Sequence, residues 1–310
     1  MVLEVKYIDQ NDRIEYNGHI GVLGFFDGLH IAHQALIKKG MDLKKKTGKK
    51  LLVFTFDQSI GKYLRNQPFY HLTSIEDKKN LLERYAVDVL YVFKVSKEFI
   101  SLSPDAFVKQ YLIDLAHVVV GFDFSYGFRS VGRVNDLKTY QSFKTHVMEE
   151  LTYQDEKIGS TKIREYLDQG EMDLATFLLG RHYQIRGEVI HGRGVGKVLG
   201  FPTANIDFTN YYLPKRGVYL TKVILDSDIH YGVTNVGKKP TFKDQSISLE
   251  TYIFDLNKDL YGRIITIEFL EFMRDEIKYS NKEALIKQIE KDVIRAKDIM
   301  LRRKKSEKIR

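Results

Sequence analysis

A pair of histidines near the start of the chain is spaced three residues apart, which can place both on one face of a helix. The apolar run 20–26 leads into a segment that contains Gly24, Asp27, Gly28, His30 and His33. If a helix begins directly after this segment, the two histidines share one face of its first turn. They then lie beside free backbone N–H groups and the positive end of the helix dipole, where a phosphate chain can bind. The alternative is that one or both histidines only cap the helix.

A glycine-rich segment in the second half of the chain could also bind phosphate. Residues 191–205 combine glycines with cations and place Thr203 two residues before Asn205. A glycine-rich backbone can fold around phosphate oxygens, and threonine and asparagine oxygens are hard ligands that suit Mg²⁺. The segment matches neither a Walker A loop nor a dinucleotide-binding fingerprint. A long hairpin loop would explain the composition equally well, so composition alone leaves its function open.

The first half of the chain alternates short apolar runs with segments of helical period. The expected strands are 20–26, 51–56, 89–95 and 117–121. The expected helices are 32–46, one that opens with a capping box at 73–76, and one that opens with Ser103 and Pro104. Such alternation predicts a doubly wound, Rossmann-like α/β fold whose ligands bind at the carboxyl ends of parallel strands.

The pattern changes after residue 180. Short alternating strands at 217–225, 248–254 and 263–269 are separated by Gly, Asn and Asp turns, which predicts an antiparallel β-barrel or sandwich. An apolar stripe at helical spacing predicts a C-terminal helix that packs on this sheet. Its members are Leu285, Ile289, Val293, Ala296 and Met300. With 162–179 as a helical connector, we expect an α/β domain over 1–180 and a barrel domain over 181–310.

The composition of the chain excludes several classes of protein. The chain has 310 residues, of which 43% are hydrophobic and 29% are charged, as in an ordinary globular protein with two domains. Because cysteine is absent, a disulfide framework, a thiolate metal site and a cysteine nucleophile are excluded. No signal peptide and no apolar stretch near the ~20 residues of a membrane span is present, so we expect a cytoplasmic protein without a membrane partner. The net charge of +8 suits an anionic partner.

The histidine segment resembles the GxFDGxHxGH signature of the nucleotidylyltransferase superfamily, in its flavin-synthesising branch. Two further segments agree and occur in the expected order, because 120–124 resembles GxDF and 158–164 resembles ISSTxIR. The resemblance implies transfer of an adenylyl group from ATP to FMN. It implies that His30, His33 and Arg164 are catalytic, that Gly24, Asp27, Gly28, Ser160 and Thr161 bind ATP, and that Phe56, Asp123 and Phe124 bind the flavin.

The glycine-rich segment ends at 200–205 in a run that resembles the GFPTAN motif of riboflavin kinases. The likeness continues through 217–219, 234–237 and 249–255, so that with the first half it covers nearly the whole chain. The order is that of the bifunctional bacterial riboflavin kinase/FMN adenylyltransferase family, also called FAD synthetases. The resemblance implies that Thr203 and Asn205 hold Mg²⁺ and ATP phosphates, that Glu250 is the general base, and that Arg274 contacts nucleotide or flavin. The other implied ATP-binding residues of the kinase are Gly192, Gly194, Gly196 and Lys197.

The surroundings of Glu250 can also be inferred from the strand pattern alone, without the family resemblance. The period of two in a strand places it on the same face as Tyr252 and Phe254. A carboxylate among aromatic side chains loses hydration, which strengthens it as a base. Taken on its own, the residue would more simply be an exposed carboxylate on an edge strand.

The chain departs from the family pattern at several positions. Ala32 stands where the HxGH motif has glycine, which lets backbone approach a phosphate closely. The segment 55–60 lacks the prolines that usually follow TFD, and Tyr252 replaces the histidine of the kinase motif. A monofunctional riboflavin kinase with a degenerate adenylyltransferase domain is therefore one alternative. The other is a flavin- or nucleic-acid-binding regulator that uses the basic residues 301–310.

If the chain is a bifunctional riboflavin kinase and FMN adenylyltransferase, its expected partners are the small molecules riboflavin, FMN, FAD and ATP, with Mg²⁺ as the cofactor. We do not expect nucleic acid among the partners. The sequence leaves the oligomeric state open.

Overall fold

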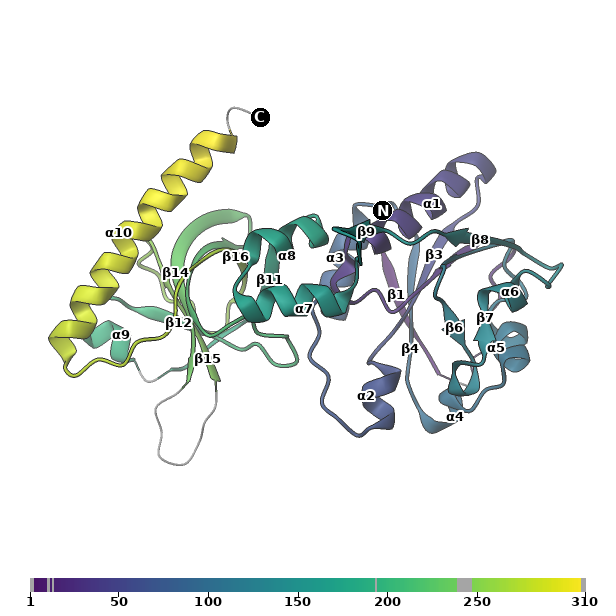
Figure 1. The fold of residues 1–310 in the computed structure, drawn as a ribbon, viewed down its shortest axis with the longest axis horizontal. Coiled ribbons are helices and arrows are strands. Elements are labelled where there is room, and N and C mark those ends of the chain that lie inside the picture. The colour runs from purple at the N-terminus through teal and green to yellow at the C-terminus, as the bar shows by residue number, and fades with distance from the viewer. Residues whose placement is uncertain (1–2, 10–11, 13, 193, 239–246, 308–310) are drawn as a thin grey trace. The chain divides into compact units, whose positions relative to one another are not determined.

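The computed structural model describes all residues of the chain except 1–2, 10–11, 13, 193, 239–246 and 308–310. The chain divides into two compact units, residues 1–160 and residues 161–310. Figure 1 shows a sheet flanked by helices in the first unit and a barrel with a long C-terminal helix in the second. The two architectures expected from the sequence are both present.

The first unit is built on a six-stranded parallel sheet with the strand order β1-β4-β3-β2-β5-β8. Its strands are β1 (Glu4–Ile8), β2 (Ile20–Leu23), β3 (Leu51–Phe56), β4 (Val89–Phe93), β5 (His117–Gly121) and β8 (Lys144–Met148). Side chains on both faces of β2, β3 and β4 are buried, as in parallel sheets that helices cover on both sides. The Rossmann-like prediction is confirmed.

Helices cover both faces of this sheet. The helices α1 (Ile31–Thr47) and α3 (Ile75–Glu83) bury their apolar residues in the core on one face. The opposite core contains side chains of α4 (Lys97–Ile100), α5 (Pro104–Tyr111) and α6 (Val134–Leu137). The remaining short elements are η1 (Asp27–Leu29), α2 (Ile60–Leu64), β6 (Ser125–Tyr126), η2 (Phe128–Ser130), β7 (Gly132–Arg133), β9 (Thr152–Tyr153) and β10 (Glu156–Lys157).

The helix α5 begins at its expected capping residue, and α3 begins one residue later than expected. The Ser74 hydroxyl accepts a hydrogen bond from Asp77 N at 3.1 Å, and Asp77 Oδ2 accepts one from Ser74 N at 3.3 Å. This reciprocal capping box lies one residue later than the predicted segment 73–76. Ser103 caps α5 by accepting from Ala106 N at 3.1 Å, with Pro104 at the first helical position.

The first strand of the predicted set is shorter than expected. The sheet pairing of β2 ends at Leu23, because the backbone turns at Phe26, which has a left-handed φ of 51°. Residues 24–26 therefore belong to the loop between β2 and α1. This correction assigns Gly24 to the loop that carries the candidate site.

The second unit is a closed antiparallel barrel with the strand order β11-β12-β15-β14-β13-β16. Its strands are β11 (Tyr183–Ile190), β12 (Thr203–Ile206), β13 (Gly217–Leu225), β14 (Asp228–Lys238), β15 (Ile247–Ile253) and β16 (Ile264–Arg274). The later helices of the chain are α7 (Ser160–Gln169), α8 (Met172–Leu179), α9 (Val195–Val198) and α10 (Lys282–Glu307). The predicted barrel is confirmed.

A ladder of three buried threonines lies inside the barrel. The hydroxyl oxygens of Thr221 and Thr234 are 2.7 Å apart, and those of Thr234 and Thr251 are 2.8 Å apart. All three side chains are fully buried. Because the hydroxyls bond to one another, the ladder satisfies polar groups that would otherwise be costly in a core.

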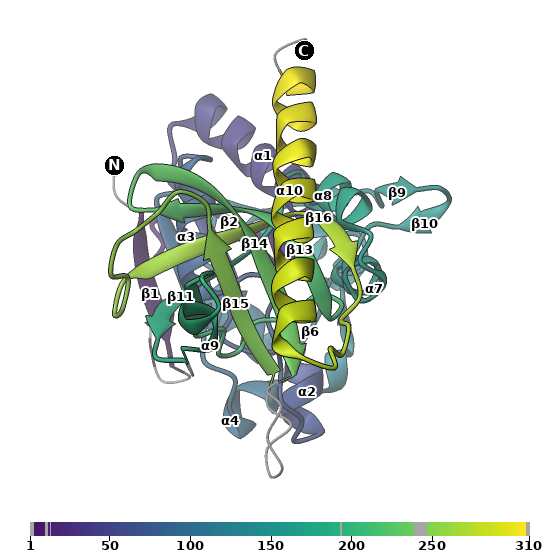
Figure 2. The same cartoon turned by 90° about the vertical axis from the view of Figure 1, so that its left-hand side faces the viewer.

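The helix α10 packs on the outside of the barrel (Figure 2). Ala296 is fully buried there, and Val293 and Met300 pack beside it in a cluster that includes Phe254 of the barrel. Three members of the predicted apolar stripe therefore pack on the barrel as expected.

The expected connector over 162–179 is two helices, α7 and α8. They meet at Gly170, which has a left-handed φ of 80°. Lys215 N donates to Leu167 O at 2.8 Å, and α8 contacts β11 and β16. Residues after 160 thus group with the barrel, while the domain boundary between residues 180 and 181 stays a prediction.

Candidate active sites

The predicted phosphate loop lies at the carboxyl end of β2. Phe26, Gly28 and Leu29 have left-handed φ angles of 51°, 79° and 42°. Glycine adopts this conformation without strain, whereas Phe26 and Leu29 are held in it by side chains that are 1% exposed. The turn starts α1 directly beyond the edge of the sheet.

The two histidines lie against each other at the start of α1. His30 is the N-cap residue, and its Nδ1 accepts a hydrogen bond from His33 N at 3.4 Å. The two imidazole rings stack with their centroids 3.5 Å apart and an interplanar angle of 21°. The prediction that they share one face is confirmed. His30 also caps the helix, so the capping alternative holds for this residue as well.

Asp27 ties the loop to two distant parts of the chain. Its side chain is 1% exposed, and Oδ1 accepts a hydrogen bond from Leu72 N at 2.9 Å. Its backbone oxygen accepts one from the Ser160 hydroxyl at 2.8 Å. Ser160 therefore lies at the phosphate loop, where the motif resemblance places it.

The next residues of that motif lie along α7. Thr161 is exposed. Arg164 is half-buried, and its guanidinium carbon is 5.1 Å from the centroid of the Tyr212 ring. Because Arg164 belongs to the second unit, its part in the first site stays a prediction.

A lysine that the motifs do not mark lies beneath the loop. Lys78 of α3 is fully buried, and its Nζ donates to Phe25 O at 3.0 Å and to Thr55 Oγ1 at 3.3 Å. Burial lowers the pKa of Lys78 to about 8, against an opposing attraction from Asp27. A signal was available in the sequence, because Lys78 lies three residues before Leu81 on the apolar face of α3.

Phe56 belongs to an aromatic cluster at the carboxyl end of β3. Its ring centroid is 5.6 Å from that of Phe93 and 6.4 Å from that of Phe25. Phe25 in turn contacts Phe69 at 5.3 Å and His71 at 6.5 Å. Because Phe25 and Phe56 are only half-buried, aromatic surface remains accessible beside the phosphate loop.

Asp123 and Phe124 follow β5 at the same edge of the sheet. They line a cavity of about 550 Å³ whose walls also include Arg133 and Val147. The Asp123 carboxylate forms an ion pair with Lys157. The structure thus places two of the predicted flavin-binding residues beside one cavity.

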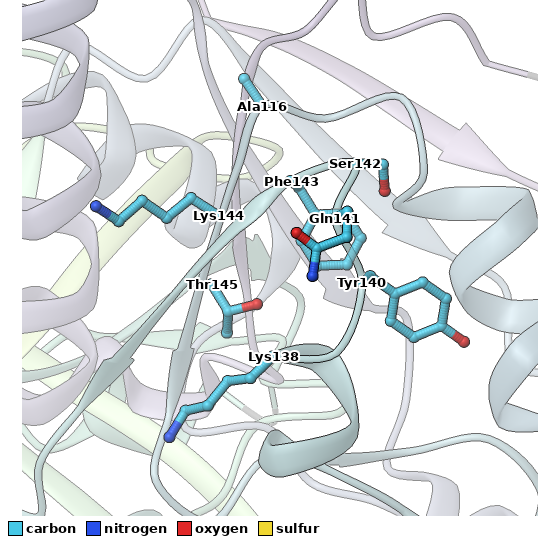
Figure 3. A pocket seen from close by; sticks show the side chains of 8 residues that line it. All are labelled: Ala116, Lys138, Tyr140, Gln141, Ser142, Phe143, Lys144 and Thr145. Carbon is cyan, nitrogen blue, oxygen red and sulfur yellow. The ribbon is translucent and has the colours of Figure 1, made fainter.

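A second cavity, of about 520 Å³, lies at the opposite edge of this sheet (Figure 3). Ala116 and Lys144 line it at the amino ends of β5 and β8, together with Lys138 and Tyr140. Ligands of open α/β sheets bind at the carboxyl ends. No predicted site residue is among the described residues that line this cavity, so we do not assign it to the site.

Glu250 lies between two asparagines of neighbouring strands. In the strand pairing it is opposite Asn205 of β12 on one side and Asn235 of β14 on the other. Opposed residues of adjacent strands point to the same face. Because Thr251 points into the barrel, the three half-buried polar side chains form a row on its outer face.

The aromatic residues expected on the same face as Glu250 contact one another in the structure. The rings of Tyr252 and Phe254 are 6.0 Å apart, and Phe201 meets Tyr252 edge-on at 5.3 Å. Since β15 is paired on both sides, the alternative of an edge-strand carboxylate is wrong.

Two glycines of the 191–205 segment pack against the predicted ligand residues. A Cβ at Gly196 would overlap Phe201 O and lie 3.1 Å from Thr203 Oγ1. A Cβ at Gly192 would overlap the amide group of Asn205. Glycine is therefore required at both positions by close approach.

The rest of this segment surrounds the short helix α9. Gly194 is exposed, has a left-handed φ of 69° and faces open space. Lys197 is the predicted cation of the segment, and its side chain lies outside the described part of the structure. Its role stays a prediction.

Arg274 is held by α10. Its Nε donates to both carboxylate oxygens of Asp292, at 2.9 and 3.1 Å, and its Nη2 donates to Oδ2 at 2.5 Å. Asp292 is 4% exposed and also accepts from Gln288 Nε2 at 2.9 Å. The pairing fastens β16 to α10, so the predicted contact with nucleotide or flavin would have to use the remaining N–H donors of Arg274.

The described residues contain no group of three or more His, Cys, Asp or Glu that could hold a metal ion. None of the helices found in them is long and apolar enough to cross a membrane.

Two family models match the chain, one in each half. The FAD synthetase model matches residues 13–162, and the riboflavin kinase model matches residues 179–300. Their order is the one that the motifs predict.

Relatives match over most of the chain. The bifunctional riboflavin kinase/FMN adenylyltransferase of Listeria monocytogenes is 41% identical over 87% of this chain and 88% of the relative. That of Bacillus subtilis is 40% identical over 87% of this chain and 89% of the relative. The crystal structure of the macrolide-efflux protein from Streptococcus pneumoniae has a TM-score of 0.86 at 29% identity and covers 95% of this chain and 99% of that chain. With identities of this size along both halves, the chain belongs to the family of bifunctional riboflavin kinase/FMN adenylyltransferases.

Proposed function

We propose that the chain makes FAD from riboflavin in two ATP-dependent steps, one in each unit. The barrel phosphorylates riboflavin to FMN, and the α/β unit adenylylates FMN to FAD. One observation carries the proposal: each family match falls on a unit whose own site has groups suited to that step. These groups are the stacked His30 and His33 in the first unit and Glu250 beside Asn205 in the second.

In the adenylyl transfer, a phosphate oxygen of FMN attacks the α-phosphorus of ATP. The bond from that phosphorus to the bridging oxygen breaks, and pyrophosphate leaves. Because the attacking phosphate is already anionic, no strong general base is needed. Catalysis must come from groups that stabilise negative charge around the transferring phosphorus.

The residues of the first unit suit that task. We assign charge stabilisation to His30 and His33, together with Arg164 as the family motif implies. The loop residues Gly24, Asp27 and Gly28, with Ser160 and Thr161, would bind the ATP phosphates. The start of α1 supports this assignment, since helix N-termini bind anions through free N–H groups.

The flavin ring of FMN needs an aromatic, partly open surface near this loop. Phe56 supplies one within the aromatic cluster at the end of β3. Phe124 and Asp123 line the cavity beside β5. We assign all three to flavin binding in this unit.

In the kinase step, Glu250 accepts the proton of the 5′-hydroxyl of riboflavin. The hydroxyl oxygen then attacks the γ-phosphorus of ATP, and ADP leaves. Phosphoryl transfer depends mainly on positioning and on stabilising charge. We assign ATP binding to Gly192, Gly194, Gly196, Lys197, Thr203 and Asn205, and nucleotide or flavin contact to Arg274.

The donors on β12 fit Mg²⁺. Thr203 and Asn205 are half-buried, lie two residues apart on one face, and present a hydroxyl and an amide oxygen. Mg²⁺ commonly takes few ligands from protein and completes its shell with waters and substrate phosphates. When bound, Mg²⁺ would neutralise charge on the ATP phosphates. Gly192 and Gly196 let the backbone of the glycine-rich segment pack directly against these two side chains.

The adenylyl transfer is tested with FMN and Mg·ATP as the only substrates. We expect His30→Ala and His33→Ala to lower FAD formation at least ~10²-fold, as expected when a charge-stabilising donor is lost. Riboflavin phosphorylation in the same variants should stay at the wild-type rate. His146→Ala is the matched control, because His146 lies on β8 in the same unit and outside the proposed site.

Two results would contradict these roles. Wild-type rates of FAD formation in both histidine variants would remove the stacked pair from the reaction. Equal loss of both activities in either variant would mean that the two steps do not use separate sites.

A further inference from the structure

Lys78 is a fully buried cation whose hydrogen-bond acceptors are neutral. Its Nζ donates to Phe25 O and Thr55 Oγ1 and lies 4.9 Å from the centroid of the Phe25 ring. In the described part of the chain, Asp27 attracts it without forming an ion pair. A buried ammonium group is costly unless a negative charge compensates it. Burying this positive charge directly behind the phosphate loop therefore reduces the stability of the fold.

The loop geometry connects this charge to the other side of the loop. The carbonyl of Phe25 faces Lys78 and Thr55. In a trans peptide, the C=O of one residue and the N–H of the next lie in one plane and point in opposite directions. The N–H of Phe26 consequently points away from Lys78, at the start of the left-handed turn that leads to Asp27 and Gly28.

We propose that Lys78 is a positioning residue for adenylyl transfer, which holds the Phe25 carbonyl inward and places a buried positive charge behind the loop. The phosphates of ATP bring further negative charge close to it when they bind. This inference rests on the proposed function of the first unit. Lys78 acts through the Phe25 carbonyl and through the electric field of its own ammonium group. It does not touch the substrate.

The contact of Thr55 with Phe25 indicates that the hydrogen bond to the Phe25 carbonyl does not by itself explain a buried lysine at position 78. The Thr55 hydroxyl donates to the same Phe25 carbonyl at 2.7 Å, without a charge. A neutral donor is therefore already present, and a second one would not need to be a buried cation. Because burial brings the pKa of Lys78 down to about 8, its charge is also lost at moderately alkaline pH.

The test measures binding of inorganic pyrophosphate to the full chain by calorimetry, without flavin. In Lys78→Met, which keeps the volume but removes the charge, we expect at least roughly tenfold weaker binding. The melting temperature of the first unit should stay the same or rise, because replacing a buried charge by an apolar group is often stabilising. Lys79→Met, a partly exposed neighbour on the same helix, should bind pyrophosphate within about twofold of wild type.

A pH series adds a second readout. Above pH 8 the wild-type Lys78 becomes neutral, so the wild-type advantage over Lys78→Met should shrink as pH rises through 8. Lys78→Gln keeps an N–H donor for Phe25 O and lacks the charge, and it should lose affinity as Lys78→Met does. It serves as the test if the methionine variant does not fold.

The outcomes distinguish this inference from the proposed function. If the folded Lys78 variants bind pyrophosphate as wild type does and melt at lower temperature, Lys78 is only structural and the inference is wrong. If the wild-type chain itself binds no pyrophosphate, the proposed function of the phosphate loop fails as well.

Discussion

Glu250 of β15 and Asn205 of β12 lie directly opposite each other in the barrel. Opposed residues on adjacent strands have Cβ atoms about 4.5–5.5 Å apart. The proposed base therefore lies beside the amide that is proposed to hold Mg·ATP. Asn235 occupies the corresponding position on the other side of Glu250.

The first prediction concerns this base. Glu250→Gln keeps the side-chain size and one carbonyl oxygen but cannot accept the proton, so riboflavin phosphorylation should fall by ~10²–10⁴. Riboflavin affinity should change far less. The same variant given FMN and Mg·ATP should still make FAD. Product formation is followed by chromatography, with Glu188→Gln on the exposed face of β11 as the control. A near wild-type phosphorylation rate would show that Glu250 is only a strand carboxylate.

The second prediction concerns the helices before the barrel. Fragments 161–310 and 181–310 should both fold and phosphorylate riboflavin, because the barrel and α10 form a core of their own. The longer fragment should melt at least several degrees higher, since each kcal/mol shifts the Tm of such a domain by about 4 °C. It retains the bond from Lys215 N to Leu167 O and the ion pair of Arg303 with Asp173.

Thermal unfolding of the two fragments decides where the domain begins. Equal melting temperatures would mean that α7 and α8 add nothing to the barrel. An insoluble or inactive 181–310 fragment would rule out the predicted boundary after residue 180.

The third prediction concerns the ion pair between β16 and α10. Asp292→Asn leaves the largely buried Arg274 without its charged partner, which should destabilise the second unit by about 3–5 kcal/mol. Denaturant unfolding measures this, with Asp298→Asn on the exposed side of α10 as the control. A loss no greater than that of the control would show that the pair does not fasten the helix.

The fourth prediction concerns the alanine that replaces glycine in the first motif. Ala32→Gly removes a half-buried methyl group from the first turn of α1. FAD formation should stay equal or rise, because backbone can then approach a phosphate more closely. The first unit should lose about 1 kcal/mol of stability. A severe drop in FAD formation, measured with FMN and Mg·ATP, would show that the pocket is shaped around the methyl group.

Features set by neighbouring residues could be predicted from the sequence. The serine and proline at 103–104 start α5 as their types require, and the alternation in β15 places Glu250 on the same face as Tyr252. The spacing of His30 and His33 likewise predicts that they meet. These features depend on helix and strand periods, which short segments determine.

Features set by long-range packing could not be predicted in this way. Lys78 contacts a carbonyl 53 residues earlier in the chain, and no motif marks that pair. The family resemblance implies that Arg274 contacts a ligand, but no motif indicates that its guanidinium also pairs with Asp292, on a helix that only tertiary packing places there. The turn after β2 likewise holds the buried Phe26 in a left-handed conformation, which the β propensity of phenylalanine does not predict.

Time courses with the unmodified protein show whether one chain carries both activities. Purified full-length chain is incubated with riboflavin and Mg·ATP, and riboflavin, FMN and FAD are separated by chromatography over time. FMN should appear first and should then be converted to FAD. Accumulation of FMN alone, with no FAD even when FMN is supplied, would contradict the proposed adenylyl transfer. Unchanged riboflavin would contradict the proposed kinase.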